Sequence, residues 1–171
     1  MKRILIICGA VLLMAMNAKA QKFALVDMEY IMKNIPAYEM ANEQLNQLSQ
    51  RWQKEVEAKG KEVQTMYNNF KSDMVFLTDE QKQKREQEIV DKEKEANELK
   101  YKYFGPEGEL YKKRVALMEP IQEEVYNAVK GIAQTKGFQL VLDRSADNGI
   151  IFASPAIDIS NEVLARLGYS K

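Results

Sequence analysis

The side chains of this chain that could carry acid–base chemistry are almost all carboxylates. The 171-residue sequence contains no histidine, and its single cysteine, Cys8, lies within the first twenty residues. These absences remove the commonest general base, the nucleophiles that need a histidine partner, and the usual zinc ligands. The sequence also has no GxxxxGK phosphate loop, and no GxGxxG segment follows a predicted strand. We therefore predict a protein that is not an enzyme and that uses no metal and no other cofactor.

Two carboxylates, Asp143 and Asp147, flank a predicted tight turn and are the best candidates for hydrolytic or calcium chemistry. Short polar side chains are also what a turn needs, because they bond to the backbone nearby. We favour the role in the turn, and a carboxylate hydrolase remains a third hypothesis for the function. Substitution of both residues would test it.

One apolar cluster exceeds what a two-helix interface needs. The segment "MYNNFKSDMVFL" places methionines and aromatic residues close together, as in surfaces that bind varied partners. We call five of its residues the tip cluster: Met66, Tyr67, Phe70, Met74 and Phe76. They are our candidates for contact with a binding partner. The alternatives are that they pack against one another, or that the turn is shorter than predicted.

These residues belong to a predicted helical hairpin, which we call the arm, over residues 37–118. Apolar residues recur every three or four positions from Tyr38 to Leu77, and then every seven residues at Ile89, Ala96, Tyr103, Leu110 and Leu117. This spacing is typical of a coiled coil. Between the two stripes, Thr78 and Gln81 form a capping-box pattern that predicts a new helix, so the tip lies near residues 77–79. The arm would be roughly 60 Å long.

The segment Gly105, Pro106 and Gly108 interrupts the second helix of the arm. Because the seven-residue repeat continues from Tyr103 to Leu110, we predict a bent but continuous helix. The hairpin register places Tyr103 opposite Trp52. It also places Pro36 opposite Pro120, which we take as the ends of the arm.

The remaining residues, 21–36 and 119–171, predict a small body. We expect a strand at 23–26, a short helix after Asp27, a helix ending near Gly137, and a last helix from residue 158 or 160 to Leu167. "FQLVLD" and "IIFAS" read as an antiparallel strand pair. Three short strands leave unpaired edges, so the body should oligomerise. Four residues should lie in its shared sheet: Phe23, Leu25, Leu140 and Leu142. The fold class is α+β, mostly α.

The first twenty residues predict an export signal. Lys2 and Arg3 precede an apolar run, and Ala18 and Ala20 stand where a signal peptidase cleaves, so we expect cleavage after Ala20 and a periplasmic product. A retained membrane anchor is the alternative, but the run is short for a bilayer. Without the signal the chain has 22 basic and 25 acidic residues. That balance predicts no nucleic-acid partner.

The order of these elements resembles the Skp/OmpH family of periplasmic chaperones. The most specific segments are "FALVDMEYI", "ALMEPIQEEVYNAVKGIAQTKGFQLVLDRS" and the ending "AIDISNEVLARLG". The resemblance implies a jellyfish-like homotrimer with a small β-barrel body and three arms around a cavity. It also implies binding of unfolded outer-membrane proteins, without nucleotide or metal. Well-known members are strongly basic and this chain is not, so membrane or lipopolysaccharide contact is doubtful here. The FGPEG interruption resembles only a subset of relatives.

Two functions from different classes follow from the residues and this resemblance. The first is an ATP-independent holdase that keeps unfolded outer-membrane proteins from aggregating on their way to the outer membrane. The second is an exported coiled-coil spacer or envelope adaptor that binds one folded partner. Suppression of the aggregation of a denatured barrel would distinguish them.

Overall fold

The structure is a computed structural model that describes residues 22–146 and 149–169. The chain divides into two compact units. The hairpin unit comprises residues 35–123, and the terminal unit comprises the described residues before 35 and after 123. The predicted signal peptide and Asp147 lie outside the described residues. No helix in the described part of the chain combines the length and the apolar character needed to cross a membrane.

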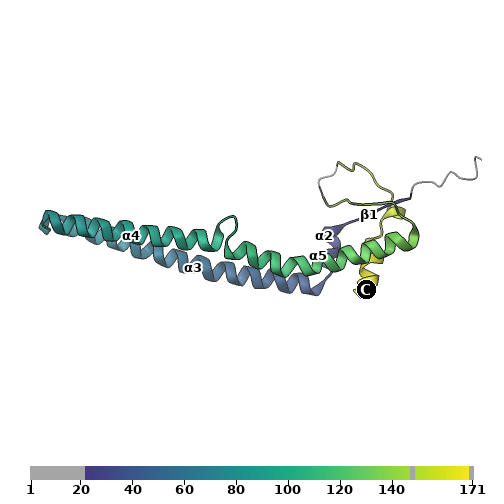
Figure 1. Cartoon of the computed structure of the whole chain (residues 1–171), viewed down its shortest axis with the longest axis horizontal. Helices are drawn as coiled ribbons and strands as arrows, with labels where there is room; N and C mark the ends of the chain where they lie inside the picture. The colour runs from purple at the N-terminus through teal and green to yellow at the C-terminus, as the bar shows by residue number, and fades with distance from the viewer. Residues whose placement is uncertain (1–21, 147–148, 170–171) are drawn as a thin grey trace, which may run out of the picture. The chain divides into compact units, whose positions relative to one another are not determined.

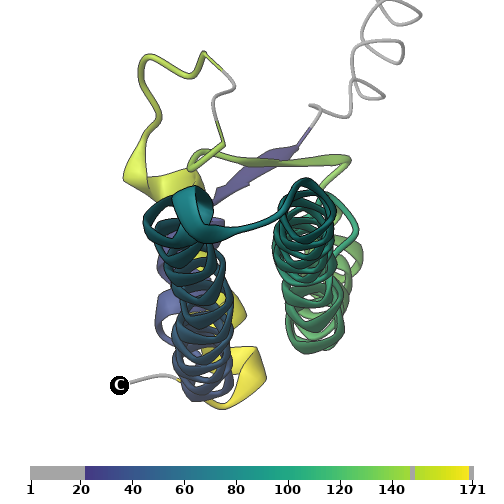
Figure 2. The same cartoon turned by 90° about the vertical axis from the view of Figure 1, so that its left-hand side faces the viewer.

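The hairpin unit is built from two long antiparallel stretches of helix. Helix α3 (Pro36–Asp73) runs outward, the short 3-10 helix η1 (Met74–Phe76) turns the chain, and α4 (Asp79–Phe104) returns. Helices α3 and α4 lie side by side (Figures 1 and 2). Pro36 stands in the first turn of α3, where its missing N–H costs nothing. The long helical hairpin of the prediction is confirmed.

The turn between α3 and α4 is closed by the predicted capping box. The Gln81 N–H donates to Thr78 Oγ1 at 3.3 Å, and the Thr78 N–H donates to Gln81 Oε1 at 3.0 Å. Arg85 reaches back across the turn to Asp73 at 2.9 Å. Two backbone N–H groups that the helix itself cannot bond are thus satisfied by side chains, and one ion pair joins the two helices. The turn lies where the sequence predicts it.

The prediction of a continuous second helix is wrong. Helix α4 ends at Phe104, and α5 (Glu109–Lys136) starts after a short loop that Figure 1 shows leaving the line of the helix. Within the loop, the Gly108 N–H donates to the carbonyl of Gly105 at 2.9 Å. Pro106 has no N–H to donate, and its ring crowds the preceding turn of the helix. The flanking glycines let the backbone leave the helical conformation, so the helix ends there and does not merely bend.

Pro120, which the sequence analysis takes as one end of the arm, lies inside α5. A proline in a helix interior removes one hydrogen bond and costs about 3 kcal/mol in isolation. Apolar residues at helical spacing continue on both sides of it, from Leu117 through Ile121 to Val125. Their packing outweighs the local preference, so the helix continues.

The terminal unit holds a two-stranded sheet. Strands β1 (Phe23–Val26) and β2 (Leu140–Asp143) pair in parallel, with Phe23 opposite Leu140 and Leu25 opposite Leu142. The predicted antiparallel partner at 150–154 is wrong, since the described residues there form no strand. Instead the chain returns to the other side of β1, where the Ile159 N–H donates to the Leu25 carbonyl at 2.9 Å. A parallel pair needs a long connection, and residues 27–139 supply it.

Three helical segments pack in the terminal unit: α2 (Met28–Lys33), the last part of α5, and α6 (Ser160–Leu167). The predicted ends at Asp27, Gly137 and Gly168 are confirmed. The apolar side chains of these segments and of β1 form the core of the unit. Its buried members are Ala24, Leu25, Val26, Ile31, Met32, Val125, Ala128, Ile132, Ile159, Val163 and Leu164.

Candidate binding surfaces

The tip cluster is divided between the surface and the helix interface. Phe76 is 86% exposed and its neighbour Val75 is 77% exposed. Tyr67 and Met74 are also exposed, whereas Met66 is half-buried. Phe70 is buried, so it packs within the hairpin and offers no free surface in this conformation. Four of the five predicted contact residues are therefore accessible, and Phe70 supports them from inside.

The exposed tip residues follow from the geometry of a two-helix interface. Only one stripe of each helix faces the other helix, so a short turn has room to cover few side chains. Met74, Val75 and Phe76 all belong to η1, a single 3-10 turn with no buried residue. Three consecutive large apolar residues on one such turn cannot share one inward direction. The result is an apolar end to the hairpin.

The interface of α3 and α4 ends at an aromatic contact. The rings of Trp52 and Tyr103 are stacked, with centroids 4.8 Å apart and planes 6° from parallel. The Tyr103 hydroxyl donates to Glu55 Oε2 at 3.0 Å. This hydrogen bond is the first cause of a raised pKa of the Tyr103 hydroxyl, with smaller contributions from partial desolvation and the Glu55 charge. The predicted pairing of Trp52 with Tyr103 is confirmed.

Both glycines of the interruption stand where the backbone approaches closely. A Cβ on Gly105 would lie 2.4 Å from the Tyr101 carbonyl oxygen and 3.3 Å from two ring atoms of Tyr101. A Cβ on Gly108 would lie 2.8 Å from the carbonyl oxygen of Tyr103. Positions 105 and 108 thus have no room for a side chain, and the Tyr101 ring lies close to Gly105.

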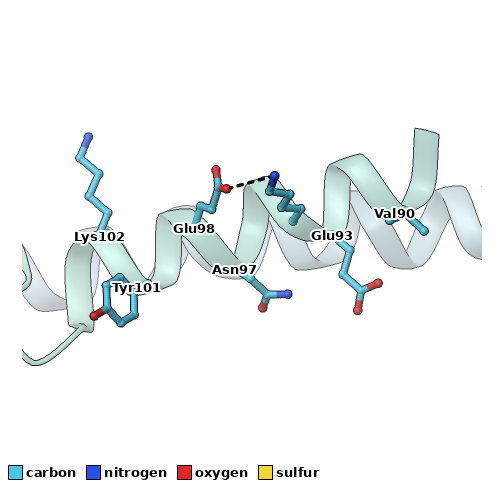
Figure 3. A pocket seen from close by; sticks show the side chains of 7 residues that line it. Val90, Glu93, Asn97, Glu98, Tyr101 and Lys102 are labelled. Carbon is cyan, nitrogen blue, oxygen red and sulfur yellow. Dashed lines mark ion pairs between the residues drawn. The ribbon is translucent and has the colours of Figure 1, made fainter. Parts of the chain in front are cut away.

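An open groove on α4 was missed in the sequence. It encloses about 710 Å³, and all the residues that line it come from α4 (Figure 3). Val90 and Tyr101 supply its apolar surface and are 55% and 70% exposed. The sequence pattern that could have revealed the groove is a second stripe at helical spacing, beside the coiled-coil stripe. It consists of Val90, Asn97, Tyr101 and Phe104, spaced by seven, four and three residues. We call this surface the α4 groove.

The predicted sheet residues differ in burial. Leu25 is 3% exposed, but Phe23, Leu140 and Leu142 are exposed. In the nearby sequence Ile151 and Phe152 are also almost fully exposed. The sheet of one chain therefore leaves apolar side chains uncovered on its outer surface.

Three aspartates of the terminal unit, Asp27, Asp143 and Asp158, take part in structural hydrogen bonds and ion pairs. Asp143 Oδ1 accepts from Ser145 Oγ at 2.7 Å and from the N–H groups of Ser145 and Met28. Partial desolvation raises the pKa of Asp143, but these hydrogen bonds outweigh it and the pKa is lowered overall. Arg144 bridges Asp27 and Asp158 at 3.2 and 3.1 Å. No group of acidic, histidine or cysteine side chains within the described ranges could hold a metal ion.

Comparison with known proteins places these features in a family. The family model described as outer membrane protein (OmpH-like) matches residues 22–167. The chaperone protein Skp of Yersinia enterocolitica is 24% identical over 159 residues, which cover 93% of each chain. A crystal structure of an OmpH-like protein from Caulobacter crescentus CB15, described as a candidate outer membrane chaperone, superposes with a TM-score of 0.68 at 12% identity. It covers 88% of this chain and 86% of that one.

The family match spans both units, from the residue before β1 to the end of α6. The structural likeness likewise includes the long hairpin and the small sheet. The chain therefore belongs to the OmpH-like family.

Proposed function

We propose that this protein is an ATP-independent periplasmic holdase that binds unfolded outer-membrane proteins and keeps them from aggregating. The observation that carries the proposal is the apolar tip of the hairpin, where Met74, Val75 and Phe76 lie exposed on one turn. Membership of the OmpH-like family and the likeness to the chaperone Skp support it. Exposed methionine and aromatic side chains suit clients of varied sequence, because they adapt to many shapes.

The mechanism rests on many weak contacts. Each exposed apolar side chain that a client covers contributes at most a few kcal/mol, so single contacts form and break quickly. Several hairpins that act together raise the local concentration of binding surfaces, and the total affinity becomes useful while release stays fast. A homotrimer with three arms would provide this arrangement. The exposed residues Phe23, Leu140 and Leu142 support association through the sheet.

Dilution of a urea-denatured outer-membrane barrel protein tests the proposal. With the mature protein present at about one trimer per barrel, light scattering should stay low, and the complex should sediment as one species. A mature protein that sediments as a monomer, or that leaves the scattering unchanged, would contradict the holdase model. The second of these results would favour the spacer that binds a folded partner.

A further inference from the structure

The α4 groove has a volume of about 710 Å³, and neighbouring hollows continue it beyond α4. A second hollow is lined by Asn97, Tyr101 and Phe104 among others, and a third by Phe104 together with Val56 of α3. Neighbouring hollows share residues, so they form one band that runs along α4 and into the furrow between α4 and α3. The band lies well away from η1 in the sequence, on residues that the tip cluster does not include.

The exposed apolar side chains of the hairpin are unevenly placed. On α4, Val90, Tyr101 and Phe104 are all at least 37% exposed. In the described residues of α3, the exposed large apolar side chains are Met40 and Tyr67, which stand near its two ends. A solvated coiled coil would show polar residues on the outside of both helices. In α5 the same unit also exposes Tyr111 and Val115, but Val90, Tyr101 and Phe104 are the ones that lie on or beside the α4 groove, and they indicate a surface that something covers.

Tyr101 is held in position by the loop that follows α4. Its ring lies against Gly105, where a Cβ would come within 3.3 Å of two ring atoms. The Gly105 N–H also donates to the Tyr101 carbonyl at 2.7 Å. A tyrosine has few rotatable bonds, so a fixed ring binds apolar surface with little loss of entropy. The interruption of the helix therefore orients the most exposed aromatic ring of the α4 groove.

The polar residues of the α4 groove favour an extended segment over a second helix as its occupant. Lys94 and Asn97 stand between Val90 and Tyr101 at helical spacings of four, three and four residues, which place all four on one face of α4. A second copy packed helix on helix would bury these polar groups, which weakens a coiled coil. An extended strand has a different period, with about 6.6 Å between side chains on the same face. It can therefore place apolar residues at Val90 and Tyr101 and leave Lys94 in water.

The charged residues that line the α4 groove balance one another, which favours an occupant without net charge. The lining holds Glu93, Glu98, Lys94 and Lys102, two residues of each sign. Lys94 and Glu98 form a loose ion pair of 3.9 Å, marked by the dashed line in Figure 3. A groove without net charge selects neither acidic nor basic partners. Strands of outer-membrane barrels, in which apolar and polar residues alternate, fit both conditions.

We propose that the α4 groove binds extended segments of an unfolded outer-membrane polypeptide in which apolar or aromatic residues alternate with polar ones, with Tyr101 as the anchoring ring. This inference rests on the proposed function and names a site for it that is separate from the tip cluster. Val90 and Tyr101 are eleven positions apart, a rise of about 16 Å, so an extended segment of about five to seven residues spans both side chains.

The test uses a ten-residue peptide of alternating phenylalanine or valine and serine or threonine, with a fluorescent label at one end. Its binding to the full mature protein is followed by fluorescence anisotropy. Tyr101→Ser should weaken binding about tenfold, the loss expected for an anchoring aromatic residue. Tyr101→Phe should retain most of the affinity, since the ring and not the hydroxyl makes the contact.

Two matched controls make the test specific. Tyr126 of the terminal unit is 62% exposed and Tyr67 of α3 is 52% exposed, both comparable with Tyr101 at 70%. Tyr126→Ser should leave peptide binding unchanged. If Tyr67→Ser weakens binding and Tyr101→Ser does not, the α4 groove is not the site. Equal binding by all variants would overturn the proposal as well. Far-UV circular dichroism at 222 nm checks that every variant remains helical.

Position-specific cross-linking gives an independent measurement. A photoreactive phenylalanine analogue at Tyr101 should cross-link a denatured barrel protein, whereas the same analogue at Tyr126 should not. Cross-links from Tyr126 alone would contradict the proposal. Different results would contradict the two proposals. If the wild-type protein does not suppress barrel aggregation, the holdase function is wrong. Normal suppression by Tyr101→Ser, with no cross-link at Tyr101, contradicts the α4 groove alone.

Discussion

Trp52 of α3 and Tyr103 of α4 stack face to face, 4.8 Å apart, one residue before the return helix ends. Their contact closes the interface between the two helices at the point where the loop 105–108 begins. The rings of Phe104 and Tyr103 are nearly perpendicular, with centroids 6.4 Å apart, and Glu55 accepts a hydrogen bond from the Tyr103 hydroxyl. The aromatic contact and the loop are thus adjacent parts of one structure, and the following predictions probe each of them.

The stack should contribute to the stability of the hairpin. Trp52→Ala removes a large half-buried ring and should lower the free energy of unfolding by about 1–3 kcal/mol. Trp52→Phe retains an aromatic partner for Tyr103 and should lose less. Urea titration followed by circular dichroism at 222 nm measures both. An unchanged unfolding midpoint for Trp52→Ala would mean that the rings lie together without stabilising the helices.

The raised pKa of the Tyr103 hydroxyl predicts a loss of stability at high pH. Its hydrogen bond to Glu55 exists only while the hydroxyl is protonated, so the neutral form is favoured in the folded state. This contribution is complete below the ordinary tyrosine pKa of about 10 and is lost as the pH rises through the folded value. Glu55→Gln should move the pKa of Tyr103 back toward the ordinary value.

Trp52 reports this ionisation directly, because it is the only tryptophan in the sequence and touches the Tyr103 ring. Its fluorescence should fall as the neighbouring tyrosinate forms. The midpoint of that fall should be lower in Glu55→Gln than in the wild type. Equal midpoints would show that Glu55 does not determine the pKa of Tyr103.

Asp143 should stabilise the terminal unit above about pH 4. Its pKa is lowered because hydrogen bonds from Ser145 and the Met28 N–H outweigh partial desolvation, so the folded state favours the charged form. The contribution is present above the unfolded value of 3.8 and is lost as the pH falls through the lower folded value. Asp143→Ala should therefore be less stable than the wild type at pH 7.

Urea titrations at pH 7 and at pH 3 measure this difference. The gap between wild type and Asp143→Ala should narrow at the lower pH. A gap that stays constant across that range would assign the loss to packing and not to the carboxylate charge. Asp143→Ala should still suppress barrel aggregation, because Asp143 acts in the fold and not in client binding.

The loop glycines should resist substitution for a steric reason. Gly105→Ala would place a Cβ 2.4 Å from the Tyr101 carbonyl oxygen and should lower the free energy of unfolding by roughly 1–3 kcal/mol. Gly60→Ala is the matched control, since a Cβ there meets nothing within 4 Å and the site lies inside α3. It should stabilise the protein by up to about 1 kcal/mol. Equal effects of the two changes would contradict the close-packed loop.

Replacing Gly105, Pro106 and Gly108 together with alanine should have the opposite effect. Without proline the backbone can donate again, and helix can extend across the gap by about one turn. The ellipticity at 222 nm and the unfolding midpoint should both rise. We expect a stiffer hairpin with a narrower range of client sizes. If large and small barrels are held equally well, the loop serves only the packing beside Trp52.

The heptad stripes, the capping box at Thr78 and the helix ends at Asp27, Gly137 and Gly168 followed from the sequence alone. Each depends on residues a few positions apart, so local spacing carries the information. The stack of Trp52 on Tyr103 was also predictable, because a hairpin with a known turn fixes which residues face each other. The family resemblance agreed with these elements and is confirmed over residues 22–167.

Tertiary structure decided the rest. The parallel partner of β1 is β2, more than a hundred residues later, and no local pattern shows which distant strand will pair. The helix continues through Pro120 because packing on both sides outweighs a local penalty. The same neighbours decide that Phe70 is buried and Tyr101 is exposed, since burial depends on what lies opposite a side chain in three dimensions.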